Sequence, residues 1–315
     1  MNVLARFIAV LPLAVAVWAQ TPAPPYVQEG KTKKVSKHVW VIPDGRVNLV
    51  PNIGIIAGSK ATLVVDSGMG PKNGEATLRE VRKISQDAQL YLTTTHFHPE
   101  HVSGFQVFPG SARLLRPLVQ QEELVRGTAA MNEMFSKMSP VHADLLRDVK
   151  MRPPDLTFGD FVEIDLGGVT ARIFTLGPAH TRGDNFVFVK EDGLLFGGDV
   201  ITNRFFPIIL NESGASWIGV LNRVAMLKPV IVVPGHGEVG DGSLIARERV
   251  FLTEMQTRTR ALRAQGKSPD ETAARLTEEL KAKHPDWENP EFLSAGILRF
   301  YAEATNRGQN DKSAP

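Results

Sequence analysis

Cysteine is absent from the 315 residues of this chain. Its absence excludes disulfide bonds, catalysis by a thiolate nucleophile and metal binding by thiolates. Any metal ion must therefore be held by imidazole and carboxylate groups. This makes the eight histidines the first residues to consider.

The chain also lacks a long run of charges of one sign, and its basic residues gather only in the short stretch KTKK at residues 31–34. The formal net charge is +2 and the isoelectric point is near 8.8. A balance this weak and dispersed does not indicate nucleic-acid binding. With 43% hydrophobic and 22% charged residues, the chain can bury an ordinary globular core as one large domain or two small ones.

The amino terminus lacks an apolar run long enough to span a membrane, which takes about 20 residues. An apolar stretch from Phe7 to Ala19 follows Arg6, and Val17-Trp18-Ala19 offers a small residue at a cleavage position. This pattern is typical of a secretory signal peptide, here residues 1–19. We therefore expect an exported protein, periplasmic or secreted, that leaves the membrane after cleavage; a membrane anchor is the alternative. Residues 20–37 contain several prolines and are predicted to be a linker.

Residues 38–242 mix strand-like runs with helix-like segments, which predicts two sheets, each covered by helices on its outer face. Residues 243–315 are predicted to form a helical extension, and Ser268 and Glu271 are spaced as a capping box. Helices are predicted near residues 73–85, 117–138 and 217–227. Strands are predicted at residues 38–43, 47–50, 53–58, 61–68, 89–95, 112–116, 161–166, 169–176, 185–190, 194–200 and 230–237.

Three of the eight histidines lie in one stretch, THFHPEH, at residues 95–101. His96 and His98 are two positions apart at the end of a strand-like run, so their side chains point the same way. Pro99 suits the first turn of a following helix, which would carry Glu100 and His101. One short segment can thus direct four side chains to two adjacent metal positions.

Three further candidates lie downstream: His180, Asp199 and His236. Each stands at a strand-to-loop junction with glycine nearby, in LGPAHTRGDN, LLFGGDVI and VIVVPGHGEV. Glycine lets the backbone approach closely and keeps such a side chain at a loop tip. The histidines at positions 38, 142 and 284 have no comparable context.

In order and spacing, this set resembles the metallo-β-lactamase superfamily over about residues 39–242, with its H-x-H-x-D-H motif and later histidine, aspartate and histidine. The resemblance implies an α/β fold, a four-layer αβ/βα sandwich, with the site at one edge of the two sheets. It also implies zinc, two ions, although iron or manganese suits the same ligands. The implied ligands are His96, His98 and His180 for the first metal and Glu100, His101 and His236 for the second, with Asp199 bridging.

Two acidic residues stand apart in this comparison. Glu100 occupies a position that is normally aspartate, and its side chain is one methylene longer. It either binds or faces the second metal with altered affinity, or acts as general base in an enzyme with one metal. Asp66, in VVDSG, either orients a histidine ligand through the ring's other nitrogen or caps a turn.

The resemblance implies a metal-dependent hydrolase in which Glu100 and Asp199 are catalytic and a metal-bound hydroxide attacks the carbonyl of an ester, thioester, lactone or β-lactam. Its partner would be a small-molecule substrate. The alternatives are a mononuclear iron oxidoreductase or dioxygenase of the same fold, and a non-catalytic metal-binding protein.

Side chains near these positions could also contact a substrate. Phe205 and Phe206 either form an apolar rim or pack beneath a loop. A stripe at Met131, Met134, Phe135 and Met138 is typical of core, but methionine also adapts to varied ligands. Arg182 and Arg204 either bind a substrate carboxylate or are solvated.

Overall fold

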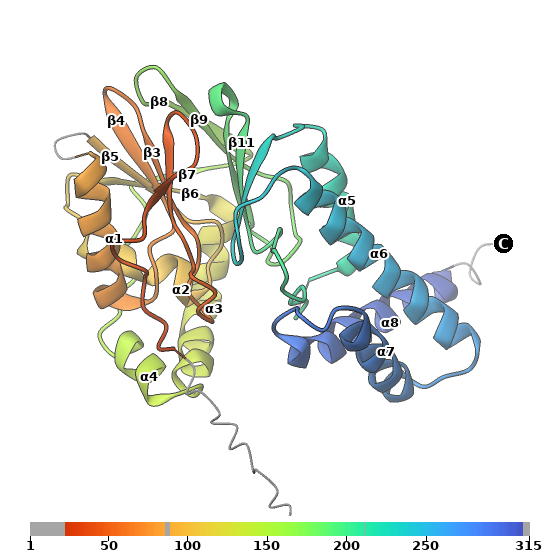
Figure 1. Ribbon diagram of the computed structural model, residues 1–315. Coiled ribbons are helices and arrows are strands. Elements are labelled where there is room, and N and C mark those ends of the chain that lie inside the picture. The colour runs from red at the N-terminus through yellow and green to blue at the C-terminus, as the bar shows by residue number, and fades with distance from the viewer. Residues whose placement is uncertain (1–22, 86–88, 211, 311–315) are drawn as a thin grey trace, which may run out of the picture.

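The computed structural model describes residues 23–85, 89–210 and 212–310, so the predicted signal peptide at 1–19 lies outside the described residues. Two sheets face each other, and helices cover the outer side of each (Figure 1). The predicted αβ/βα sandwich is therefore confirmed. Among the described residues, no helix has the length and apolar character needed to cross a membrane.

The first sheet has seven strands in chain order, antiparallel from β1 to β4 and parallel from β4 to β7. Helices α1 (Gly70–Ile84), α2 (Pro99–Val102), α3 (Leu118–Ser136) and α4 (Pro140–Leu146) belong to this half of the molecule. The strands are β1 (Lys33–Lys34), β2 (Val39–Ile42), β3 (Ile53–Ala57), β4 (Ala61–Val65), β5 (Gln89–Thr93), β6 (Arg113–Pro117) and β7 (Leu156–Phe158).

The second sheet has five strands in the order β12-β11-β10-β9-β8, and only its β11–β12 pair is parallel. Helices α5 (Gly214–Ala225), α6 (Ser243–Ala264), α7 (Pro269–Lys283) and α8 (Leu293–Asn310) follow it. The strands are β8 (Phe161–Asp165), β9 (Thr170–Thr175), β10 (Asn185–Val189), β11 (Leu194–Gly198) and β12 (Ile231–Pro234).

Both faces of the central strands are buried, which explains their nearly continuous hydrophobic sequence. In β4, Leu63 packs between the two sheets, whereas the next residue, Val64, packs in the cluster that also holds Val81 of α1. This alternation follows from the two-residue period of a strand. The sheets are thereby fixed face to face, with their loops gathered at shared edges.

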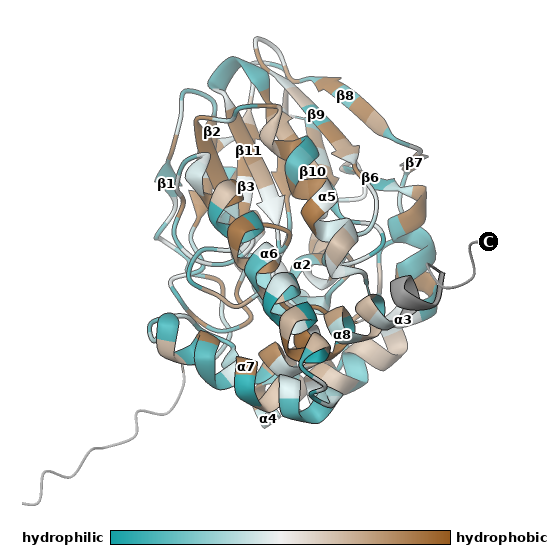
Figure 2. Cartoon of the chain, turned by 90° about the vertical axis from the view of Figure 1, so that its right-hand side faces the viewer, coloured by the Kyte–Doolittle hydropathy of each residue, from teal (hydrophilic) through white to brown (hydrophobic). Residues whose placement is uncertain are grey.

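The carboxyl-terminal helices pack on the outer face of the second sheet, where Trp217 of α5 is fully buried in the same cluster as Phe251 of α6 and Phe300 of α8. Hydrophilic residues cover much of the outward surface of α6 and α7, while the strands are mostly hydrophobic (Figure 2). Ser268 and Glu271 form both hydrogen bonds of the predicted capping box at the start of α7.

The structure differs from the sequence-based expectation in three places. Residues 47–50, predicted as a strand, form turns in which Leu49 has a φ of 58°, because the local hydrogen bonds close back on themselves instead of joining a sheet. The end of the predicted linker 20–37 contributes β1, which pairs with β2, and Val27 is buried. Helix α4 and strand β7 correspond to no predicted element.

Candidate metal centre

The junction between β5 and α2 places His96, His98, Glu100 and His101 as the sequence predicts. Strand β5 ends at Thr93, His98 is the residue before α2, and Pro99 is in its first turn. All four side chains are buried. The strand end and the short helix therefore present four polar groups to the interior within six residues.

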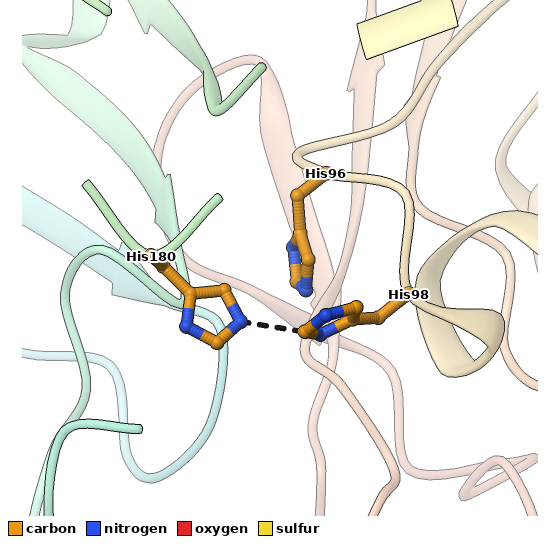
Figure 3. A group of neighbouring side chains, drawn as sticks. All are labelled: His96, His98 and His180. Atoms are coloured by element: carbon orange, nitrogen blue, oxygen red, sulfur yellow. Dashed lines mark hydrogen bonds between the residues drawn. The ribbon is translucent and has the colours of Figure 1, made fainter. Parts of the chain in front are cut away.

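His180 joins His96 and His98 from the other half of the molecule, and the three rings converge (Figure 3). The ring centroids lie 4.6–4.8 Å apart. His180 Nε2 lies 3.2 Å from His98 Nδ1. One nitrogen from each ring lies within 4.8 Å of the others, which is close enough for a single ion to contact all three.

A second group lies next to the first and consists of Glu100, His101, Asp199 and His236. Its ligand atoms also lie within 4.8 Å of one another, and all four side chains are buried. The structure thus brings together all seven residues that the sequence names as ligands, and it divides them into two neighbouring groups.

Asp199 stands between the two groups, because each of its oxygens faces a different one. Oδ2 lies 3.9 Å from His96 Nε2 and 3.8 Å from His180 Nε2. Oδ1 lies 3.5 Å from His101 Nε2 and 3.6 Å from His236 Nε2. One carboxylate can therefore contact ions in both positions.

The outward nitrogen of three histidines is held by an oxygen, which leaves Nε2 directed into the centre. His180 Nδ1 lies 3.0 Å from the carbonyl oxygen of Ile208, and His236 Nδ1 lies 2.9 Å from that of Val50. His101 Nδ1 lies 2.9 Å from Asp66 Oδ2. Such contacts fix the tautomer and the ring orientation of metal-binding histidines.

Asp66 also fastens the strand end that carries the histidines. Its Oδ1 accepts a hydrogen bond of 2.7 Å from the Thr95 backbone N–H, and its Oδ2 accepts one of 2.9 Å from Thr95 Oγ1. Asp66 itself has a φ of 66°, which is uncommon for a residue other than glycine. Asp66 thus contacts a histidine ring, which is one of the two alternatives that the sequence suggested, and its other hydrogen bonds reach Thr95 instead of a local turn.

Four polar atoms at the centre are buried without a hydrogen-bond partner among the described residues: His96 Nε2, His101 Nε2, Glu100 Oε2 and Asp199 Oδ1. Each unpaired buried polar atom costs about 1–3 kcal/mol, so a cluster of them calls for an explanation. Cations bound in the two groups would contact all four. Imidazole and carboxylate donors fit zinc and also iron or manganese.

Burial lowers the pKa of His96 and His98 well below the usual value for histidine, and it also lowers the pKa of His180. The three rings are therefore neutral, which is the form that binds metal. Burial disfavours ionisation of Asp199, but the neighbouring imidazoles, those of His236 and His101 foremost, outweigh it and lower its pKa to about 2. Burial raises the pKa of Glu100 to about 8 in the metal-free chain.

Glycines allow the close approach of Asp199, as their positions in the sequence suggested. A Cβ at Gly235 would lie 2.0 Å from Asp199 Oδ1. Gly198 has a φ of 53°, and a Cβ there would lie 2.6 Å from Cβ of Thr95. Side chains at either position would therefore displace the aspartate or the histidine-bearing strand end.

Two supporting residues carry no recognisable sequence signal. Gln120 of α3 is buried and hydrogen-bonds to Thr94, Thr95 and Gly183, which joins the two halves behind the centre. Asp184 is buried and accepts hydrogen bonds from the Thr181 N–H, at 2.9 Å, and from Thr181 Oγ1, at 2.7 Å, so it shapes the loop of His180. Burial raises the pKa of Asp184 well above its usual value.

A cavity of about 370 Å³ opens onto the centre. Phe205 and Phe206 line it, although both are almost fully buried. Of the predicted methionine stripe, Met134 and Met138 line the cavity and are 41% and 43% exposed, so they are not core residues. Met131 instead packs against the small cluster around Phe135.

The remaining candidates lie elsewhere. Arg182 and Arg204 do not line this cavity, and Arg204 lies 3.6 Å from the carboxylate of Asp286. The other three histidines make ordinary structural contacts: His38 with Asp192 at 2.7 Å, His142 with Ser139 at 2.8 Å, and His284 with the Trp287 ring at 4.3 Å between centroids.

The fold is a two-sheet αβ/βα sandwich, and its facing edges bring five histidines and two carboxylates together. These features place the protein among the metal-binding α/β proteins. The chain belongs to the metallo-beta-lactamase superfamily, whose family model matches residues 47–236. The matched segment contains all seven residues of the centre, whereas α6, α7 and α8 lie beyond it.

Individual relatives are distant and carry hydrolase names. A linear primary-alkylsulfatase from Pseudomonas sp. (strain ATCC 19151) is 22% identical over 63% of this chain and 44% of its own length. A metallo-beta-lactamase type 2 from Bacteroides fragilis is 28% identical over 65% of this chain and 77% of its own. The solved structure of the sec-alkylsulfatase Pisa1 from Pseudomonas sp. has a TM-score of 0.65 at 14% identity, over 90% of this chain and 52% of that one. The chain thus spans about half the length of the alkylsulfatases that it matches.

Proposed function

We propose that this chain is an exported hydrolase that binds two zinc ions and cleaves an ester, thioester, lactone or β-lactam bond in a small molecule. The position of Asp199 carries the proposal, because one of its oxygens faces His96 and His180 and the other faces His101 and His236. The hydrolase names of the relatives support the reaction class.

The two groups of residues would each hold one metal ion. His96, His98 and His180 would hold one ion, and Glu100, His101 and His236 the other, with Asp199 between them. Bound zinc lowers the pKa of a coordinated water to about 7 and polarises a substrate carbonyl. Asp66 holds the His101 ring, and the aromatic side chains of Phe205 and Phe206 keep bulk water from the reacting bond.

Glu100 faces the second group despite its extra methylene. Its Oε1 lies 4.0 Å from His101 Nε2, and its Oε2 is buried without a hydrogen-bond partner among the described residues. Both atoms are therefore placed to contact an ion held by His101 and His236. This supports a ligand role for Glu100 over the alternative of a general base in an enzyme with one metal.

Counting metal ions per chain tests the binuclear proposal. After zinc loading and removal of free metal, plasma emission should find two ions per chain in the wild type and one in His236→Ala. Glu238→Gln is the matched control, because Glu238 is exposed and lies two residues away. It should keep two ions. One ion in the wild type would reject the binuclear site.

The hydrolase proposal is tested with the same zinc-loaded protein on a panel of esters, thioesters, lactones and nitrocefin. Turnover should disappear in His96→Ala and should be retained in Glu238→Gln. Absence of turnover on the whole panel by protein that carries two zinc ions would favour a non-catalytic metal-binding protein. Iron in place of zinc in freshly purified protein would favour the oxidoreductase.

Export is proposed from the sequence of residues 1–19 alone. When the full chain is expressed in a bacterial host with a periplasm, the protein should appear in the periplasmic fraction. Amino-terminal sequencing should then begin at Gln20. Recovery of the uncleaved chain in the membrane fraction would indicate an anchor instead.

A further inference from the structure

The cavity over the metal centre has a polar floor and an apolar wall. His98, Glu100, His180, Asp199 and His236 form the floor. The wall comes from four separate segments, which are residues 48–49, the end of α3 and the turn after it, residues 202–210, and residues 289–292 before α8. Backbone hydrogen bonds tie the last two segments together, because the Phe206 N–H donates to the carbonyl of Glu288 and the Glu288 N–H donates to that of Arg204.

The rim of this cavity is apolar where it meets solvent. Met134 of α3 and Met138 in the turn after this helix are 41% and 43% exposed, and Leu210 on another wall segment is 37% exposed. Phe292 completes the wall from the carboxyl-terminal side. Large apolar side chains that stay exposed around a concave site mark a surface that binds apolar groups, and unbranched methionine adapts to chains of varied shape.

The charged residues that line the cavity are all acidic. They are Glu100 and Asp199, which belong to the metal groups and would be neutralised by bound cations, and Glu291; no lysine or arginine lines the cavity in the part of the chain that the structure describes. Arg46 lies outside the lining, with its guanidinium carbon 5.9 Å from the Phe205 ring centroid, and it is paired with Glu288. A substrate carboxylate remote from the reacting bond would lose hydration here without gaining a partner.

We propose that the cavity selects an uncharged lipophilic substrate, a neutral ester or lactone with a long aliphatic arm, and discriminates against molecules that carry a carboxylate on that arm. This inference rests on the proposed hydrolase function and narrows it to one substrate class. The arm lies along the wall between Met134, Leu210 and Phe292, and the reacting carbonyl lies over the floor.

Paired substrates test the selectivity on the zinc-loaded full chain. The p-nitrophenyl esters of acetate, butyrate and octanoate vary the length of the arm, and kcat/KM should rise up to about fourfold for each methylene that is buried. The mono-p-nitrophenyl ester of suberic acid and its methyl ester differ only in charge at the far end. The methyl ester should have a kcat/KM at least about tenfold higher.

A variant of the rim should change this preference. Met134→Lys places a cation beside the arm at a half-exposed position, and it should reduce the advantage of the methyl ester over the free acid and slow cleavage of the octanoate. Val125→Lys is the matched control, because Val125 lies on the same helix, is 72% exposed and does not line the cavity. It should leave both preferences unchanged.

A binding measurement separates this inference from the hydrolase proposal. The neutral dye N-phenyl-1-naphthylamine should fluoresce on binding to the metal-free or zinc-loaded chain. Methyl octanoate should displace the dye better than the octanoate anion does. Met134→Lys should weaken binding of the dye. If the dye results are as expected but no ester is cleaved, the cavity binds uncharged lipophilic molecules without hydrolysing them. The inference about the ligand class then holds, and the hydrolase proposal fails.

Three outcomes would overturn the inference. They are equal or better cleavage of the free acid, a preference for nitrocefin or dodecyl sulfate over the neutral octanoate, and the absence of dye binding to the wild type.

Discussion

Replacing Glu248 by glutamine should stabilise the protein at neutral and alkaline pH. Glu248 lies on α6, is only 2% exposed, and has no positively charged partner within ion-pair distance among the described residues. Its Oε2 is 3.4 Å from the Thr202 backbone nitrogen and 3.2 Å from Thr202 Oγ1. Its Oε1 has no hydrogen-bond partner in the described part of the chain.

Burial raises the pKa of Glu248 from 4.5 to about 8, the hydrogen bonds from Thr202 oppose the rise, and the charge of Asp199 adds to it. The folded chain therefore keeps a proton that the unfolded chain releases above pH 4.5. Stability falls as the pH rises from about 4.5 to about 8, because the unfolded state binds fewer protons in this window. The difference between the two pKa values converts to a ceiling of about 5 kcal/mol.

Glutamine has the shape of the protonated acid and cannot ionise, so it avoids this loss. Urea unfolding of the metal-free full chain at pH 5, 6.5 and 8 should give a stability difference between Glu248→Gln and wild type that grows with pH to a few kcal/mol. The histidines titrate in both proteins and cancel in the difference.

Glu254→Gln serves as the control on the same helix, because Glu254 forms an exposed pair with Lys283 at 2.6 Å. An exposed pair contributes about 1 kcal/mol or less, so this variant should shift stability slightly at every pH. A difference for Glu248→Gln that is independent of pH, or a variant less stable than wild type at pH 8, would refute the argument.

Three further predictions concern the supporting structure. Asp66→Asn should weaken zinc binding by about 10–100-fold in competition with a chelating dye, because the His101 ring loses its charged partner. Unchanged zinc affinity would refute this. The control is Asp165→Asn, since Asp165 forms an exposed pair with Lys60. Gln120→Ala removes four hydrogen bonds behind the centre and should lower the free energy of unfolding by roughly 2–4 kcal/mol in urea, whereas a neutral effect would mean that water replaces them. A chain that ends at Gly242 should show no cooperative thermal transition, because α6 and α8 cover the cluster around Trp217, and a sharp transition would show that the rest folds alone.

The seven residues of the centre could be named from the sequence because their signals are local. His96 and His98 follow a recognisable strand, Pro99 marks the start of a helix, and glycines accompany Asp199 and His236. The order and spacing of these short patterns resembled one family over most of the chain. The same patterns gave the two-sheet fold, since each strand carries its own periodicity.

Features that depend on contacts distant in sequence could not be predicted. Residues 47–50 have strand-forming side chains, but Asp44 and Asn52 hold this loop in turns by hydrogen bonds that reach Gly237 and Pro234. The loop then supplies the Val50 carbonyl that holds His236. Nothing in the neighbourhood of Gln120 indicates its role either, because its partners lie 25 to 63 positions away.

The methionine stripe shows a limit of helical periodicity. The period indicates which residues share a face of a helix, but it does not indicate what that face contacts. Met134 and Phe135 line the cavity together with Met138, which follows the end of α3, whereas Met131 packs against the small cluster that holds Phe135. The stripe therefore faces a small core in part and the cavity in part. The sequence pattern favoured the core for this stripe and left a position beside the site as the alternative.

The wall of the cavity has consequences for how such an enzyme diversifies. None of Met134, Met138, Leu210 and Phe292 belongs to the groups that face the metal positions, and the last lies outside the segment that matches the family. Mutations at these four positions can therefore accumulate without loss of metal. A duplicated gene could therefore encode a protein with a different substrate preference. Its rim residues would change, while the residues of the metal centre would be inherited unchanged.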